Sequence, residues 1–299
     1  MASEAMNNLR EMINTKGLHF DEKMDILALR AMVEQMTMNM PDEPDVSFTS
    51  CTLGGIEAEL STPDKQTDDD IILYIHGGGL LSGNARSSRG YASVLAAASG
   101  FRVYSISYRL IPEHPFPAGL EDCLAAYKAL LEKHPHHKIA LVGESGGGNL
   151  SIALTLMLRD KGITLPASVT AYSPVTDMTG SMPSHKKYGG KTDKVVDANF
   201  ENLLKTKYAP DYDAKYPYVS PIFADLTGFP PLKLVADKEE TLADDSALFA
   251  EKAKVAGVDV RLQMWEGTFH AFATTGKGTP ESAQVLAETI EFMREHFSK

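Results

Sequence analysis

The chain has 299 residues, of which 43% are hydrophobic and 23% are charged, so it is long enough to bury a sizeable core without a disulfide or metal. Forty acidic against 29 basic residues give a formal net charge of −11, which argues against a protein that binds nucleic acid or an anionic membrane. No segment has the roughly 18 consecutive apolar residues of a transmembrane helix, and no apolar stretch of a signal peptide opens the chain. Together these features predict a cytoplasmic globular protein of about two domains.

Residues 1–40 have a helical pattern, with apolar side chains at helix-like intervals between Met24 and Met36 and Pro41 after the run. Methionine is frequent throughout this segment. The first interpretation is a pair of amphipathic helices with one face in the core. The alternative is an adaptable apolar surface over a binding site, because methionine is flexible and polarizable.

From Val46 the apolar period changes to two, and the pattern predicts a hairpin that turns at Gly54 and Gly55. Buried-type strands then alternate with helical patterns, which predicts βαβ units and a mostly parallel sheet. Residues 177–217 interrupt this alternation as an excursion with a short helix near residues 198–207. The further strands are expected at 71–75, 102–106, 138–142, 168–172, 232–235 and 258–265, and the helices at 89–98, 118–132, 146–160, 241–256 and 280–297.

A candidate nucleophile lies in the segment 143–147, which fits the pattern G-x-S-x-G with Ser145 at its centre. The pattern alone is weak, but here a predicted strand precedes it and a predicted helix follows it. A nucleophile elbow requires this strand–turn–helix context, with glycines where the backbone folds back on itself. The helix N-terminus that begins at Gly146 also offers N–H groups without intrahelical partners.

A second glycine-rich segment, His76-Gly77-Gly78-Gly79, directly follows the strand at 71–75. Backbone N–H groups in such a loop can stabilise the oxyanion of an acyl-transfer intermediate, since no side chain blocks their approach. A flexible turn or a phosphate loop is the alternative. The residues that follow fit neither a Walker loop nor a dinucleotide fingerprint, so no cofactor is expected.

A hydroxyl nucleophile needs a base and an acid that orients it. Of the nine histidines, His270 is the candidate base because it follows the strand at 258–265, at the sheet edge where open α/β folds place their sites. The acid should lie between Ser145 and His270 in the chain, just past a strand. Asp237, Glu239 and Glu240 all qualify, and the residues alone do not separate them. This set of groups requires no metal.

Several segments, in the same order along most of the chain, resemble motifs of the hormone-sensitive lipase family, bacterial esterases with the α/β-hydrolase fold. The resemblance implies a catalytic domain over residues 46–299 with a central sheet of about eight strands flanked by helices. It also implies a helical cap, formed by residues 1–45 and an insertion near residues 177–217. The matching segments are 76–79, 108–117, 143–148, 220–222, 242–246 and 265–272.

Carried over to this chain, the family pattern makes Ser145 the nucleophile and His270 the base. The later glycines of the loop, Gly78 and Gly79, would form the oxyanion hole together with Gly146. Gly77 is kept with them as a further member of the same loop.

The family's acid lies four residues before the aspartate of a following acidic pair, which here is Asp244 and gives Glu240. A glutamate replaces the commoner aspartate, and the segment is shifted by about one residue, so Glu239 and Asp237 stay open as alternatives. Glu144, beside the nucleophile, is expected either to support the elbow or to be solvated.

These features predict a serine carboxylesterase that hydrolyses short-chain acyl esters through an acyl-enzyme, with a small neutral ester as substrate. A lipase or an amidase on the same fold is one alternative. A non-catalytic ligand receptor of the same family is another, although such receptors lack the catalytic histidine. A homodimer through the edge strand at 258–265 is expected only from the resemblance.

Overall fold

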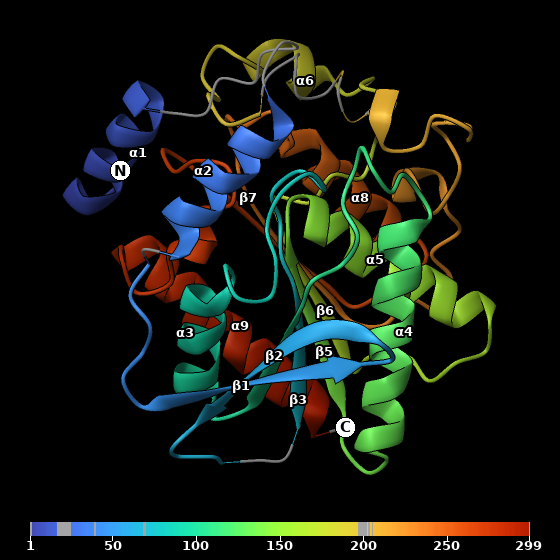
Figure 1. Cartoon of the computed structure of the whole chain (residues 1–299). Helices are drawn as coiled ribbons and strands as arrows, with labels where there is room; N and C mark the ends of the chain where they lie inside the picture. Colours follow the sequence, from blue (N-terminus) through green and yellow to red (C-terminus); the bar gives the residue numbers. More distant parts are fainter. Residues whose placement is uncertain are drawn as a thin grey trace.

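An eight-stranded sheet runs through the molecule in the order β1-β2-β4-β3-β5-β6-β7-β8 (Figure 1). β2 pairs antiparallel with both β1 and β4, whereas all neighbours from β4 to β8 are parallel. The expected mostly parallel sheet of about eight strands is therefore confirmed. The strands are β1 Val46–Leu53, β2 Ile56–Pro63, β3 Ile71–Ile75, β4 Arg102–Ile106, β5 Ile139–Glu144, β6 Ser168–Tyr172, β7 Leu232–Asp237 and β8 Val260–Trp265.

The helices cover both faces of this sheet, as the βαβ pattern predicts. The computed structural model describes residues 2–16, 25–38, 40–67, 70–196, 202, 204 and 206–298. The helices within them are α1 Glu4–Lys16, α2 Ile26–Met38, α3 Arg89–Ser99, α4 Ala118–Lys133, α5 Gly146–Asp160, α6 Pro183–Tyr188, α8 Ala243–Val255 and α9 Pro280–Phe297, with short 3₁₀ turns at Pro221–Phe223 and Phe272–Thr275. None of these helices is long and apolar enough to cross a membrane.

Side chains of the central strands point alternately to two separate apolar layers. In β3, Ile71, Leu73 and Ile75 pack in the layer that contains α4, α5 and α8, whereas Ile72 and Tyr74 pack in the layer of α3 and α9. Both faces of the strand are buried, which explains why its sequence is an unbroken apolar run rather than an alternation.

Helix α5, which begins directly after Ser145, is buried on every side from Gly146 to Leu158. Its first turn lies against β3, where a Cβ added to Gly147 would be 2.1 Å from the carbonyl oxygen of Ile75. Glycine therefore permits the close approach that places the start of α5 over the end of the sheet.

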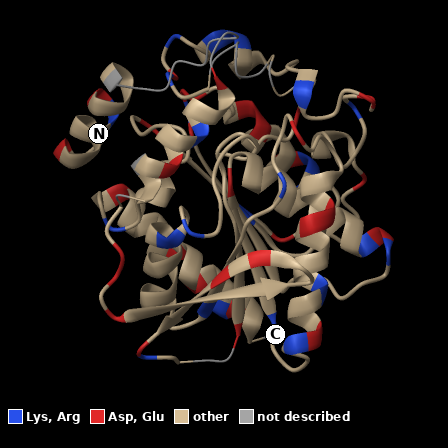
Figure 2. Ribbon diagram, viewed as in Figure 1, with Lys and Arg blue, Asp and Glu red and all other residues tan. Residues whose placement is uncertain are grey.

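The two segments outside the βαβ pattern lie at one end of the molecule, where α1, α2 and α6 are found (Figure 1). The expected pair of N-terminal helices is present as α1 and α2, although Met24 lies outside the described residues. The short helix expected at 198–207 also falls largely outside them, and α6 was not anticipated. Figure 2 shows Lys and Arg dispersed among Asp and Glu over the helices and loops.

Candidate active site

Ser145 occupies a strained turn between β5 and α5, with φ 53° and ψ −118°. A residue with a side chain rarely adopts a positive φ, and this strain is typical of a nucleophile elbow. The N–H of Ser145 donates to the carbonyl of Tyr172 at 2.8 Å, which fixes the turn against β6. Gly143 is needed as well, because an added Cβ would lie 2.5 Å from the carbonyl oxygen of Gly147.

The glycine loop after β3 leaves two of its three N–H groups available. Gly78 and Gly79 have φ values of 89° and 63°, which glycine adopts without strain. Within the described part of the chain, neither of their N–H groups donates to a protein acceptor. The N–H of Gly77, in contrast, donates to Oε1 of Glu144 at 2.6 Å. Gly77, which the sequence groups with the oxyanion glycines, therefore has no N–H left for a substrate.

Glu144 thus connects the elbow to the glycine loop, the supporting role that was one of its two expected roles. Its Oε2 accepts a hydrogen bond from the Tyr74 hydroxyl at 2.6 Å. Burial raises the pKa of the Glu144 carboxyl to about 7, even though the hydrogen bonds from Tyr74 and Gly77 favour the charged form.

The segment that begins at Tyr108 supports the same loop from the other side. The Tyr108 ring stacks on the His76 ring at 4.3 Å between centroids, and its hydroxyl donates to the carbonyl of His76 at 2.8 Å. Burial lowers the pKa of His76 to about 4, so its ring is neutral and its Nδ1 can donate to the Gly77 carbonyl, 2.8 Å away. These contacts hold the loop in one conformation.

His270 lies in the loop after β8, and its Nδ1 is 2.8 Å from Oε2 of Glu240. The other oxygen, Oε1, accepts hydrogen bonds from the Ser173 hydroxyl at 2.7 Å and from the Asp237 N–H at 3.1 Å. Every oxygen of the buried Glu240 carboxylate is therefore bonded, which fixes its orientation toward the imidazole.

The other two candidate acids lie elsewhere. Glu239 is exposed to solvent, and Asp237 accepts hydrogen bonds from the N–H and hydroxyl of Thr268 at 2.8 and 2.7 Å. Asp237 thereby anchors the loop that carries His270. Of the three carboxylates that the sequence left open, Glu240 is the one in contact with His270.

A further carboxylate, which the sequence did not suggest, lies beside this pair. Asp193 comes from the segment 177–217 and is buried, with an oxygen within 4.8 Å of the ligand atoms of both Glu240 and His270. Its Oδ2 accepts from the N–H of Thr241 at 2.9 Å, and its Oδ1 from the N–H of Val195 at 2.9 Å. The three groups lie close enough together to share a metal ion, but their oxygens and Nδ1 already bond to one another, to the Ser173 hydroxyl or to backbone N–H groups.

Three nearby carboxylates, those of Glu240, Asp193 and Glu144, favour the charged form of His270. Burial lowers its pKa, but the hydrogen bond to Glu240 and the charges of Glu240 and Asp193 outweigh burial and leave the pKa above its ordinary value. Burial likewise raises the pKa of the Glu240 carboxyl, with His270 as the main opposing influence. No hydrogen bond joins the described side chains of Ser145 and His270, which is common in an unliganded site that tightens on binding substrate.

Comparison with known proteins shows which family the chain is similar to. A family model described as the α/β hydrolase fold matches residues 72–274. An acetyl-hydrolase from Streptomyces hygroscopicus is 34% identical over 244 residues, 81% of either chain, and an esterase from Acinetobacter venetianus is 31% identical over 89% of this chain and 88% of its own. A solved esterase of the bacterial hormone-sensitive lipase family covers 99% of either chain with 33% identity and a TM-score of 0.92.

The chain belongs to the hormone-sensitive lipase family of α/β-hydrolases. A further solved relative is the esterase EstE5, in a crystal soaked with p-nitrophenyl butyrate, with 32% identity, full coverage of both chains and a TM-score of 0.93. The sequence resemblance to this family is therefore confirmed over the whole described fold.

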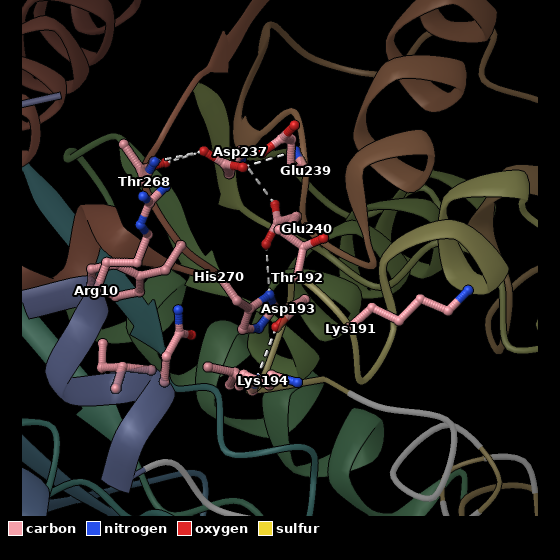
Figure 3. Close-up of a pocket in the computed structure, with 14 residues that line it drawn as sticks. Arg10, Lys191, Thr192, Asp193, Lys194, Asp237, Glu239, Glu240, Thr268 and His270 are labelled. Atoms are coloured by element: carbon pink, nitrogen blue, oxygen red, sulfur yellow. Dashed lines mark hydrogen bonds and ion pairs between the residues drawn. The ribbon is translucent and has the colours of Figure 1, made fainter. Parts of the chain in front are cut away.

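In this member of the hormone-sensitive lipase family, a cavity of about 420 Å³ borders the His270–Glu240 pair (Figure 3). Helix α1, residues 191–195 and the loops after β7 and β8 form its walls. Sequence reasoning missed Asp193 because no motif marks it within a polar, lysine-rich segment. It also missed Ser173, which donates to Glu240 and accepts from the N–H of Ala271 at 3.0 Å.

Proposed function

We propose that this carboxylic ester hydrolase is a serine carboxylesterase for short-chain acyl esters, acting through a Ser145–His270–Glu240 triad. The observation that carries the proposal is the 2.8 Å contact between Nδ1 of His270 and Oε2 of Glu240, at the sheet edge where Ser145 lies in its strained turn. A carboxylate at Nδ1 holds the tautomer whose Nε2 accepts the proton of a serine hydroxyl.

In the proposed mechanism, Ser145 attacks the ester carbonyl while His270 Nε2 takes its proton. The N–H groups of Gly78, Gly79 and Gly146 hold the oxyanion of the tetrahedral intermediate. His270 then protonates the departing alcohol, and the acyl-enzyme forms. Water, deprotonated by the same imidazole, attacks the acyl-enzyme and releases the acid.

Helices α1 and α2, together with the segment 177–217, form the cap of this site in our proposal. Their position at the end of the molecule that carries the catalytic loops supports this assignment (Figure 1). Asp193 also supports the assignment, because through this residue the segment 177–217 contributes a buried carboxylate beside His270.

Two relatives support the proposed preference for short acyl chains. One relative is named an acetyl-hydrolase, and the crystal of EstE5 was soaked with a butyrate ester. The presence of a complete His270–Glu240 pair favours an enzyme over the receptor alternative, whose relatives lack that histidine.

Two measurements test the proposal. A fluorophosphonate probe should label the wild type and the control Ser47→Ala, whose serine is exposed on β1, but not Ser145→Ala. Hydrolysis of p-nitrophenyl esters from acetate to palmitate should be fastest at two to four carbons, an estimate from the relatives above. Near wild-type hydrolysis by Ser145→Ala would refute the mechanism, and a maximum at palmitate would indicate a lipase.

A further inference from the structure

Thr241, the residue after Glu240, is held by the segment 177–217. Its side chain is completely buried, and its three polar groups all hydrogen-bond to that segment. Its N–H donates to Oδ2 of Asp193 at 2.9 Å, its hydroxyl donates to the carbonyl of Val196 at 2.7 Å, and its carbonyl accepts from the Ser184 hydroxyl at 2.7 Å. The turn that carries the proposed acid is therefore attached to the proposed cap.

Asp193 is the charged member of these contacts, and both oxygens of its buried carboxylate are bonded. Oδ2 accepts from the N–H of Thr241, whereas Oδ1 accepts from the N–H groups of Val195 at 2.9 Å and Val196 at 3.1 Å. A hydrogen bond to an ionised acceptor is stronger than one between neutral groups. Asp193 therefore fixes residues 193–196 and the turn after β7 relative to each other.

The position of this turn decides where the Glu240 carboxylate points. Its Oε1 accepts from the N–H of Asp237 at 3.1 Å, and its Oε2 lies 2.8 Å from Nδ1 of His270. Because Thr241 follows directly in the chain, a shift of its backbone would move the carboxylate away from the imidazole. A displacement of about 1 Å in a catalytic group can reduce the rate by about 100-fold.

The charge of Asp193 acts on the same imidazole. Figure 3 shows its side chain close to His270 and Glu240, and its oxygen lies within 4.8 Å of the facing atoms of both. Burial lowers the pKa of His270, whereas the hydrogen bond to Glu240 and the charge of Asp193 are among the influences that raise it. The other charged groups around His270 are Glu144 at the end of β5, Asp237 and Glu239 at and after the end of β7, Lys191 and Lys194 of the segment 177–217, and Arg10 of α1.

We propose that Asp193 is a positioning residue of the triad, which holds the turn that directs Glu240 at His270. The site then has its active geometry only while the segment 177–217 is docked on that turn. The inference rests on the proposed triad and adds to it a residue from the cap.

The first test is Asp193→Asn. The amide has one accepting oxygen where the carboxylate has two, so either Thr241 or Val195 loses the acceptor of its N–H group. For p-nitrophenyl acetate we expect kcat to fall about fivefold or more and KM to change less than about threefold, in protein whose folded state is verified by circular dichroism. The acid limb of the kcat/KM–pH profile should also move to lower pH, because one negative charge beside His270 is lost.

The matched control is Asp177→Asn, the same substitution at another buried aspartate of this segment. The oxygens of Asp177 accept from Thr179 and Ser181, two residues within the same segment. This variant should change kcat less than about twofold and leave the acid limb in place.

A double-variant comparison separates positioning from a general loss of stability. In the Glu240→Gln background, Asp193→Asn should lower kcat less than about twofold, because the contact through which it acts is already broken. A merely structural role would add its full effect in both backgrounds. Thr241→Val, which removes the bond to Val196 without changing any charge, should lower kcat about twofold or more and decides the question if Asp193→Asn does not fold.

The positioning role would be overturned if Asp193→Asn kept more than about a fifth of wild-type kcat, left the acid limb in place, or lost as much activity in the Glu240→Gln background. Failure of the esterase proposal has a different signature, since the wild type would then neither hydrolyse p-nitrophenyl acetate nor react with the fluorophosphonate at Ser145. The two proposals can therefore fail separately.

Discussion

Replacing Glu240 with glutamine tests the central contact of the site. The amide oxygen of Glu240→Gln can keep the hydrogen bonds from Ser173 Oγ and the Asp237 N–H, which lie 2.7 and 3.1 Å from Oε1. The NH₂ group must then face Nδ1 of His270 in place of Oε2. Because an amide nitrogen donates, it selects the tautomer that carries its proton on Nε2, and that nitrogen can no longer accept a proton from Ser145.

The expected loss in kcat follows from that tautomer change. The corresponding carboxylate-to-amide change in a serine protease triad costs about 10⁴-fold, equivalent to about 5 kcal/mol in the activation free energy. We expect a loss of this order in kcat for p-nitrophenyl acetate, with the folded state verified by circular dichroism and thermal unfolding.

The matched control is Glu239→Gln, which removes the same charge from the adjacent, exposed residue and should change kcat by less than about twofold. If Glu240→Gln keeps more than about a tenth of wild-type kcat, or if Glu239→Gln is the variant that loses activity, the assignment of the acid is wrong.

Three further changes probe the surroundings. Asp193→Asn should lower the pKa of His270, so the acid limb of the kcat/KM–pH profile should move to lower pH, since the base must be neutral to act. Burial raises the pKa of Glu144 from its ordinary 4.5 to about 7 in the folded protein, so the free energy of unfolding decreases as pH rises between these values. Urea unfolding should show that the wild type loses about 3 kcal/mol of stability relative to Glu144→Gln between pH 4.5 and 8. Gly147→Ala should destabilise the fold by several kcal/mol, whereas Gly162→Ala, with open space around it and φ 63°, should cost about 1 kcal/mol in the same measurement.

The sheet and its helices could be predicted because short strand patterns alternate with helical patterns along the chain, and burial on both faces makes β3 an unbroken apolar run. The strands at 71–75, 102–106 and 168–172 and the helices at 146–160 and 280–297 have the predicted limits in the structure. The segment 177–217 gave no such signal, because its described part contains the short helix α6 and irregular structure, in which buried polar groups such as Asp193 and His185 lie among buried apolar side chains.

The site was predictable where a motif fixes backbone geometry and less so where contacts join distant segments. Ser145 could be recognised because the elbow needs glycines on either side. The choice among Asp237, Glu239 and Glu240 depends on the direction in which the turn after β7 points each side chain. The neighbouring residues in the sequence do not indicate that direction. The hydrogen bond from the Gly77 N–H to Glu144 joins residues 67 positions apart, so no local sequence pattern predicts it.

The burial of α5 from Gly146 to Leu158 has a consequence for how such a protein can change. Ser145 directly precedes this helix and Gly146 begins it, and substitutions in its buried part disturb packing, as the crowding at Gly147 illustrates. The cavity walls, in contrast, come from α1 and residues 191–195, where Asn14 and Thr192 are exposed. These two parts of the chain can therefore diverge independently, and substitutions confined to the cavity walls should leave the fold and the position of Ser145 intact.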